Sequence, residues 1–251
     1  MPQDAASAPP GNRRHTMSNP VLLNHVEHRD LRVDARRGAA FGDDVMYAPA
    51  VPAEFRSLQA HYPIVSHRDA AGGFHPLALL GLRQGENLFL EGERWHATYI
   101  PLAIQRQPFL IGVSGEERMI HVDLDHPRVR AGTGEALFQG PGIASEFLER
   151  ARTTLLMLHD GILATPAFVD ALQRHQLLES FVLDIRLDDG SDNRLAGFHT
   201  IDEQRLHALD GAALEQLSRD GHLLPVYMVL ASLSRFRHLI ERMNRRRAAG
   251  R

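Results

Sequence analysis

The 251-residue chain contains no cysteine, so neither a disulfide nor a cysteine-bound metal can hold its fold together. Its stability must come from a hydrophobic core. A chain of this length can bury roughly 75% of the surface that its unfolded form exposes, which is enough for such a core. The same absence excludes thiol nucleophiles and iron–sulfur ligation.

Lysine is absent as well, so all 28 Lys+Arg residues are arginine. This excludes a P-loop lysine, a Schiff-base lysine and pyridoxal phosphate chemistry. The formal net charge of -3 is the opposite of the basic excess that nucleic-acid-binding domains usually carry. We therefore expect no specific nucleic-acid binding, although the C-terminus is locally basic.

The longest apolar stretch, residues 223–233, is far shorter than the roughly 20 residues that a membrane-spanning helix needs. We expect no membrane span. The pair Arg13-Arg14 precedes an apolar patch that is too short for an export signal, so the expected location is the cytoplasm. The expected organisation is a disordered extension over residues 1–19, one domain over residues 20–247 and a basic tail over residues 248–251.

Three pairs of β-prone segments are each joined by a short polar turn that contains glycine, which is typical of β-hairpins. They are residues 64–67 with 76–82, residues 109–113 with 119–124, and residues 181–187 with 194–200. Because hairpins follow one another along the chain, the pattern favours antiparallel sheets over alternating βαβ units.

Helix signals concentrate in the middle and at the end of the chain. Ser145, followed by acidic residues, is typical of a capped helix start. Thr165-Pro166 is typical of a second start, since proline is favoured at the first helical position. We therefore predict a helical hairpin here and a long C-terminal helix over residues 223–247. The predicted fold class is α+β, with antiparallel β-hairpins packed against the helical hairpin and the C-terminal helix.

His121 and Asp123 are the best candidates for metal ligands. They stand two residues apart on a predicted strand, so their side chains share a face and could chelate one ion. His199, on a later predicted strand, is the candidate third ligand of an iron or zinc site. The alternative is a solvated strand end, in which the residues from Asp125 onward form a turn.

Two polar groupings are candidates for a binding site. Glu86 and Asn87 lie between β-prone segments, where they either orient a ligand or satisfy buried backbone groups. Trp95, Tyr99 and Arg106 form an aromatic and arginine mixture that is enriched in recognition surfaces, with core packing as the alternative.

The arginine-rich end of the chain has two interpretations as well. Its six arginines could bind phosphate or an acidic partner, or they could simply place favourable cations at the end of a helix. They are Arg235, Arg237, Arg242, Arg245, Arg246 and Arg247.

Several short motifs along the chain resemble those of the bacterial SapC family. In the first half they are Gly38-Ala39-Ala40-Phe41-Gly42, Tyr47-Ala48-Pro49, the run from Leu79 to Leu90, Trp95, Tyr99-Ile100-Pro101 and Arg106-Gln107-Pro108-Phe109. Further along they are Asp123-Leu124-Asp125, Pro127-Arg128-Val129, Gly134-Glu135-Ala136-Leu137-Phe138 and the predicted C-terminal helix. The resemblance covers residues 21–244, nearly the whole chain.

The family label refers to surface-array proteins, and a membrane permease of peptide transport that shares the name is a different protein. Genes of the family are often found near TonB-dependent receptors, flavin-dependent halogenase-like proteins and cupin-like oxygenases. The resemblance therefore implies a role in uptake or in modification of an imported molecule. It supplies no catalytic residues.

Two classes of function follow from these observations. We favour a non-catalytic cytoplasmic accessory protein that needs no cofactor and holds a protein partner or a small molecule through Glu86, Asn87, Trp95, Tyr99 and Arg106. The first alternative is a metal-dependent oxygenase or hydrolase with His121, Asp123 and His199 as ligands. A structural role in a surface layer is the second alternative.

Overall fold

The computed structural model describes residues 18–115, 117–131 and 133–250. The predicted disordered extension over residues 1–19 lies outside the described residues except for Ser18 and Asn19, which bond to Asp123. The last residue of the predicted basic tail, Arg251, also lies outside them.

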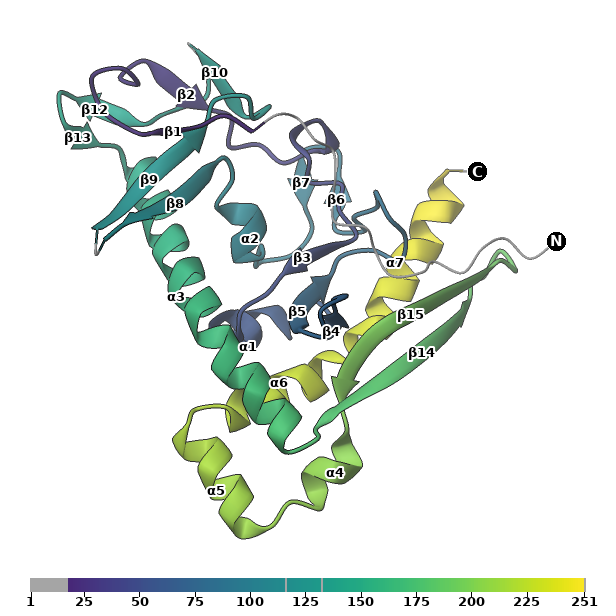
Figure 1. Cartoon of the computed structure of the whole chain (residues 1–251). Coiled ribbons are helices and arrows are strands. Elements are labelled where there is room, and N and C mark those ends of the chain that lie inside the picture. The colour runs from purple at the N-terminus through teal and green to yellow at the C-terminus, as the bar shows by residue number, and fades with distance from the viewer. Residues whose placement is uncertain (1–17, 116, 132, 251) are drawn as a thin grey trace.

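The largest sheet has five antiparallel strands in the order β14-β15-β4-β5-β3. Its members are β3 (Tyr47–Pro49), β4 (Ile64–Arg68), β5 (Phe74–Leu79), β14 (Leu178–Arg186) and β15 (Asp192–Ile201). Only Phe198 and His199 of β15 pair with β4, so the rest of the β14–β15 hairpin projects beyond the sheet (Figure 1). Gly72 and Gly190 occupy the two hairpin turns at positive φ, a conformation that glycine adopts without strain.

A three-stranded antiparallel sheet, β1-β9-β8, lies apart from the large one. It consists of β1 (Pro20–Leu22), β8 (Phe109–Ser114) and β9 (Glu117–Asp123). The remaining sheets are small. They contain β2 (Leu31–Val33) between β10 (Val129–Ala131) and β11 (Glu135–Ala136), β6 (Leu90–Glu91) with β7 (Arg94–Trp95), and β12 (Phe138–Gly140) with β13 (Ile143–Ala144). All three predicted hairpins are confirmed.

Seven α-helices and two 3-10 turns complete the described part of the chain. They are η1 (Ala39–Phe41), η2 (Pro52–Glu54), α1 (Phe55–Leu58), α2 (Leu102–Gln105), α3 (Glu146–Arg174), α4 (Glu203–His207), α5 (Gly211–Arg219), α6 (Leu223–Ser232) and α7 (Arg235–Ala249). The α+β class is confirmed.

The prediction of a helical hairpin is wrong, because α3 is one continuous helix with Pro166 inside it. Its N-cap is Ser145, as predicted, and the Ser145 side chain accepts from the Leu148 N–H at 3.1 Å. Near the proline, the Thr165 hydroxyl donates to the Gly161 carbonyl at 2.7 Å. Burial on both sides outweighs the proline, since Leu158 before it and Phe168 after it are both core residues.

Three hydrophobic clusters lie along α3, the smallest formed by Val51, Leu102 and Leu158. Its first half, through Leu148 and Leu155, packs into a small core beneath β8 and β9. Its second half, through Phe168 and Leu172, packs into the main core with the five-stranded sheet and the C-terminal helices. Figure 1 shows α3 running from β8 and β9 to the start of α6, so this helix joins the two cores.

The predicted C-terminal helix bends, and the bend separates α6 from α7. Serine hydroxyls bond within the turn, with Ser232 Oγ donating to the Val229 carbonyl at 2.6 Å and Ser234 Oγ to that of Ala231 at 2.9 Å. Such bonds back to the preceding turn often bend helices. Ser232 Oγ also accepts from the Ile64 N–H at 2.8 Å, so the bend is fixed against β4.

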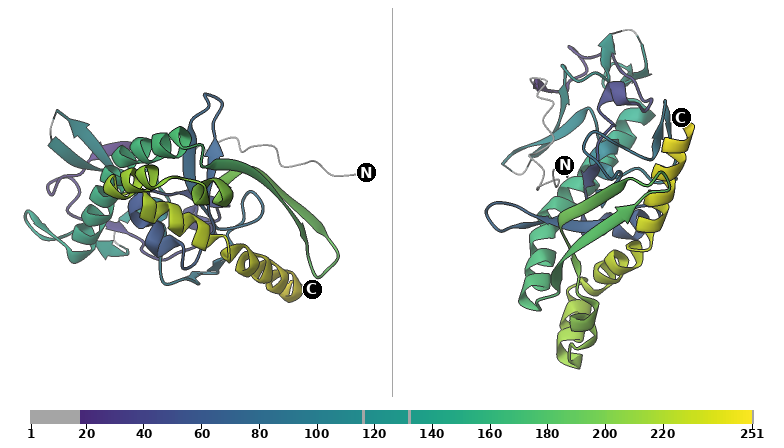
Figure 2. Two further views of the ribbon diagram at one scale, coloured as in Figure 1. Left: turned by 90° about the horizontal axis from the view of Figure 1, so that it is seen from below. Right: turned by 90° about the vertical axis from the view of Figure 1, so that its right-hand side faces the viewer.

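Beyond the bend, α7 runs beside the β14–β15 hairpin (Figure 2). Phe236 of α7 packs edge-on against Phe181 of β14, with ring centroids 5.7 Å apart. By length and composition alone, α3 and the α6–α7 run could each cross a membrane, a test that core helices of folded proteins also pass.

Candidate functional site

Trp95 and Tyr99 lie in a chain of hydrogen bonds that joins β7 and the segment after it to η2 and to the residues that follow α1. Trp95 Nε1 donates to the Tyr62 hydroxyl at 2.8 Å, and that hydroxyl donates to the Tyr99 carbonyl at 2.5 Å. The Tyr99 hydroxyl donates to Glu54 Oε2 at 2.9 Å. Burial raises the pKa of both tyrosines. The structure thus brings Trp95 and Tyr99 together and holds both in fixed positions.

Glu54 is a buried carboxylate at the end of this chain, and sequence reasoning did not single it out. It also accepts from the backbone N–H groups of Leu102 at 3.0 Å and Val51 at 3.3 Å. Burial raises its pKa, while these hydrogen bonds act in the opposite direction. The sequence feature that pointed to Glu54 was its position two residues after Pro52, where an acidic side chain favours the start of a helix.

Glu86 and Asn87 satisfy backbone groups, which was the structural alternative for this pair. Asn87 is buried, its Nδ2 donates to the Asp43 carbonyl at 2.8 Å, and its Oδ1 accepts from the Phe89 N–H at 2.9 Å. Glu86 Oε2 accepts from the Leu82 N–H at 3.3 Å, and burial raises the pKa of this carboxyl. Both side chains therefore shape the loop that leads to β6.

Arg106 lies elsewhere, at the end of α2. Its Nη1 donates to the Phe109 carbonyl at 2.8 Å, and burial lowers the pKa of its guanidinium. This contact fixes the turn between α2 and β8. Arg106 thus positions a strand of the three-stranded sheet, whereas Trp95 and Tyr99 pack against the main core.

The candidate metal ligands lie in two different sheets. His121 and Asp123 are on β9, where Asp123 accepts from Ser18 Oγ at 3.1 Å and the Asn19 N–H at 2.9 Å. His199 is on β15, with its ring edge-on to Phe74. Within residues 18–115, 117–131 and 133–250, no three His, Asp or Glu side chains are grouped to hold a metal. The structure therefore does not bring the predicted ligands together.

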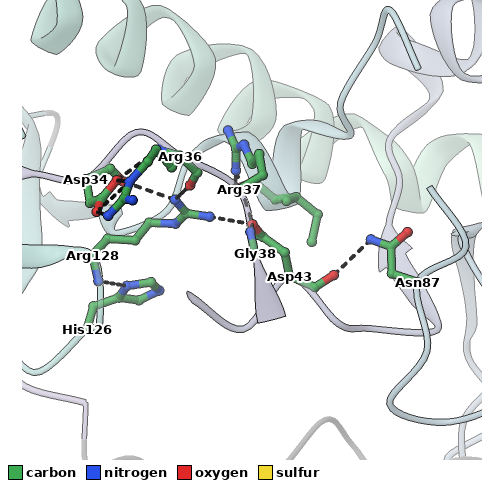
Figure 3. A network of polar contacts seen from close by, with 9 residues as sticks. Asp34, Arg36, Arg37, Gly38, Asp43, Asn87, His126 and Arg128 are labelled. Carbon is green, nitrogen blue, oxygen red and sulfur yellow. Dashed lines mark hydrogen bonds and ion pairs between the residues drawn. The ribbon is translucent and has the colours of Figure 1, made fainter. Parts of the chain in front are cut away.

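A buried ion pair lies near the loop that carries Asn87 (Figure 3). Arg128 Nη2 and Asp43 Oδ2 are 2.6 Å apart, and both side chains are almost completely inaccessible to solvent. Arg128 also donates to the backbone carbonyls of Asp34, at 3.0 Å, and Arg36. The pair thereby fixes the segment that follows β2.

Further contacts extend this ion pair in both directions. The Gly38 N–H donates to Asp43 Oδ2 at 2.9 Å, and Asn87 reaches the Asp43 carbonyl. The Arg128 guanidinium lies 4.7 Å from the centre of the Phe41 ring, a cation–π distance. The sequence signal for this network was indirect, since the Gly38 to Gly42 motif and Arg128 are among the family motifs.

The arginines of α7 bind the backbone of the loop around β6 and β7. Arg242 Nη2 donates to the His96 carbonyl at 2.8 Å. Arg246 donates to the carbonyls of Asn87 at 3.0 Å and Leu90 at 2.6 Å. These charge-assisted bonds give two of the arginines near the C-terminus a structural role, because each holds the main chain of the loop.

One side of α7 carries four basic residues, and two histidines from neighbouring loops lie beside them. We name these six residues the α7 basic face: Arg235, His238, Arg242, Arg245, His61 and His96. Burial lowers the pKa of His61, and the charges of Arg235 and Arg242 lower it further. The partly buried Trp95 precedes His96 in the chain, and its indole donates to the hydroxyl of Tyr62, whose ring lies beside that of His61. An acidic side chain, Glu91, lies 3.0 Å from His96.

Comparison with known families gives a match to the SapC family model over residues 23–239. The chain belongs to the SapC family. The matched span contains Glu54, Trp95 and the Asp43–Arg128 pair, and it ends within α7. No curated protein and no solved structure matches this SapC-family chain.

The structure also has a hollow of about 380 Å³ between η2, α3 and the start of α6. Pro52, Phe168 and Leu224 contribute to its mainly apolar lining. Because Phe168 is also a residue of the main core, we interpret the hollow as an indentation of that core.

Proposed function

We propose that this SapC-family protein is a non-catalytic cytoplasmic accessory protein that holds a protein partner on the α7 basic face. The observation that carries the proposal is the convergence of three arginines of α7 with two loop histidines beside Trp95. Tryptophan and arginine are the residues that most often dominate binding energy at protein interfaces. The family resemblance implies the setting, which is uptake or modification of an imported molecule.

The support beneath this face favours binding. Trp95 is fixed by its bond to Tyr62, and Arg235 and Arg242 are held by backbone carbonyls of Gln59 and His96. Side chains that are ordered before binding lose less conformational entropy when a partner arrives. A guanidinium has five N–H donors, and each of these two bonds uses only one.

The same geometry favours a non-catalytic role. Glu86, Asn87, Trp95 and Tyr99 all make hydrogen bonds that position backbone or neighbouring side chains. The Glu54 carboxylate accepts three such bonds at once. These polar groups therefore act as supports for a surface.

Site-directed crosslinking in an extract of the protein's own cells tests the proposal. Because the chain has no cysteine, His238→Cys gives the purified protein a single thiol on the α7 basic face, to which a photo-crosslinker is attached before the protein is added to the extract. Arg174→Cys, at an exposed position near the end of α3, is the matched control. We expect one protein, identified by mass spectrometry, to crosslink from position 238 and not from position 174. No crosslink at 238, or identical products from both positions, would refute a partner on this face.

A further inference from the structure

The spacing of the basic residues on α7 indicates what kind of surface they recognise. Arg235, His238, Arg242 and Arg245 are separated by three, four and three residues, which places them on one side of a helix. Their backbone positions span about 15 Å at the helical rise of about 1.5 Å per residue. The single acidic residue of α7, Glu241, forms an ion pair with Arg237 at 3.3 Å.

The local charge balance of this face is positive. The face carries three guanidinium groups. Two carboxylates lie close by: that of Glu91, and that of Glu241, which is three residues after His238 and four before Arg245 on α7 and pairs with Arg237. The three histidines add charge when they are protonated. The effect reaches neighbouring groups, since the charge of Arg245 lowers the pKa of Arg242, after the larger effect of burial. The face therefore attracts anions, although the whole chain has a net charge of -3.

We infer that the partner presents a short acidic peptide segment to the α7 basic face. This inference rests on the proposed function and specifies the chemistry of its partner. An extended segment of about five residues matches the 15 Å row, at about 3.3 Å per residue. Guanidinium groups pair with carboxylates in a planar two-bond geometry.

A nucleic acid fits this face less well than an acidic peptide. A phosphate backbone extends far beyond a row of this length, and a chain of net charge -3 repels such a long polyanion outside the row. The exposed side chains of the row, His238 and Arg245, are also few for a phosphate track. An oligonucleotide is therefore the natural competitor in the test.

The test measures binding of a fluorescent hexaglutamate peptide to the full chain by anisotropy, with hexaglutamine as the uncharged control. Trp95, the only tryptophan, supplies a second signal. We expect binding that weakens at least about tenfold in a His238→Glu/Arg245→Glu variant, and that weakens as ionic strength rises. Arg152→Glu/Arg174→Glu, which reverses two exposed charges on α3, should bind like the wild type.

Each other result overturns the inference. If both charge-reversal variants bound hexaglutamate equally well, the peptide would bind elsewhere on the protein. If the wild type did not bind hexaglutamate, the partner would not be recognised through an acidic segment. Tighter binding of a single-stranded oligonucleotide, lost in the His238→Glu/Arg245→Glu variant, would assign the face to nucleic acid. Crosslinking from position 238 does not depend on these peptide-binding measurements. A partner captured there that has no acidic segment would support the proposed function and refute this inference.

Discussion

Removing the Asp43 carboxylate should be among the most damaging single changes to the fold. Asp43→Ala leaves the Arg128 guanidinium buried without its counter-ion and deprives the Gly38 N–H of its acceptor. Breaking one side of a buried ion pair costs about 3–5 kcal/mol. For a chain of this size, each kcal/mol lowers the melting temperature by about 2–4 °C, so we expect a loss of about 10 °C.

A double-mutant cycle tests this reasoning. Asp43→Ala, Arg128→Met and the double variant are compared by urea and thermal unfolding, followed by circular dichroism. The double variant should be more stable than the sum of the single losses predicts, because it removes both charges of the Asp43–Arg128 pair and only Arg37, 3.8 Å from Asp43 Oδ1, loses its counter-ion. Asp184→Ala removes an exposed carboxylate 3.5 Å from Arg194 and should cause no measurable loss. A loss below about 1 kcal/mol for Asp43→Ala, or strictly additive losses, would show that the pair does not support the fold.

Three further perturbations have defined outcomes. Gly112→Ala would place a Cβ 2.3 Å from the His121 ring and should lower the free energy of unfolding, measured in urea, by about 1–3 kcal/mol. Adding His121→Ala to this variant should restore part of the lost stability. An unchanged urea midpoint for Gly112→Ala would refute the contact. Burial, followed by nearby arginine charge, lowers the pKa of His126 from 6.5 to about 4, so the unfolded chain binds a proton that the folded chain does not. The free energy of unfolding should therefore fall by about 2 kcal/mol, after allowance for partial exposure, as the pH is lowered from about 6.5 towards 4. His126→Gln should flatten this part of the plot of stability against pH. An unaltered plot would show that His126 does not cause the fall. Arg246→Ala frees two backbone carbonyls of the loop and should shift Trp95 emission to the red, whereas an unchanged spectrum would show that the loop holds without it.

The hairpins were predictable because their signals are local. Alternating apolar residues and turn glycines specify strand, face and turn within about 20 residues, and β14 and β15 follow this pattern. The division of α3 at Pro166 was wrong for the opposite reason. The local preference of proline was readable, whereas the burial of Phe168 in a distant core was not.

The candidate site shows the same limit. Trp95 and Tyr99 were recognisable as a pair from their types and their closeness in sequence. Glu54, the partner of Tyr99, lies 45 residues away in the chain, and Asp43 lies 85 residues from Arg128. Such pairs depend on how sheets and helices are placed, and no pattern in a single sequence records that placement.

The way in which α7 holds the loop around β6 and β7 affects how this protein can evolve. Arg242 and Arg246 bind the main-chain oxygens of residues 87, 90 and 96, and every amino acid supplies the same oxygen. Exposed loop positions such as Glu93 and Arg94 can therefore be exchanged while the main chain keeps its anchors. A lineage could alter the side chains beside Trp95, and with them the choice of partner, on an unchanged scaffold.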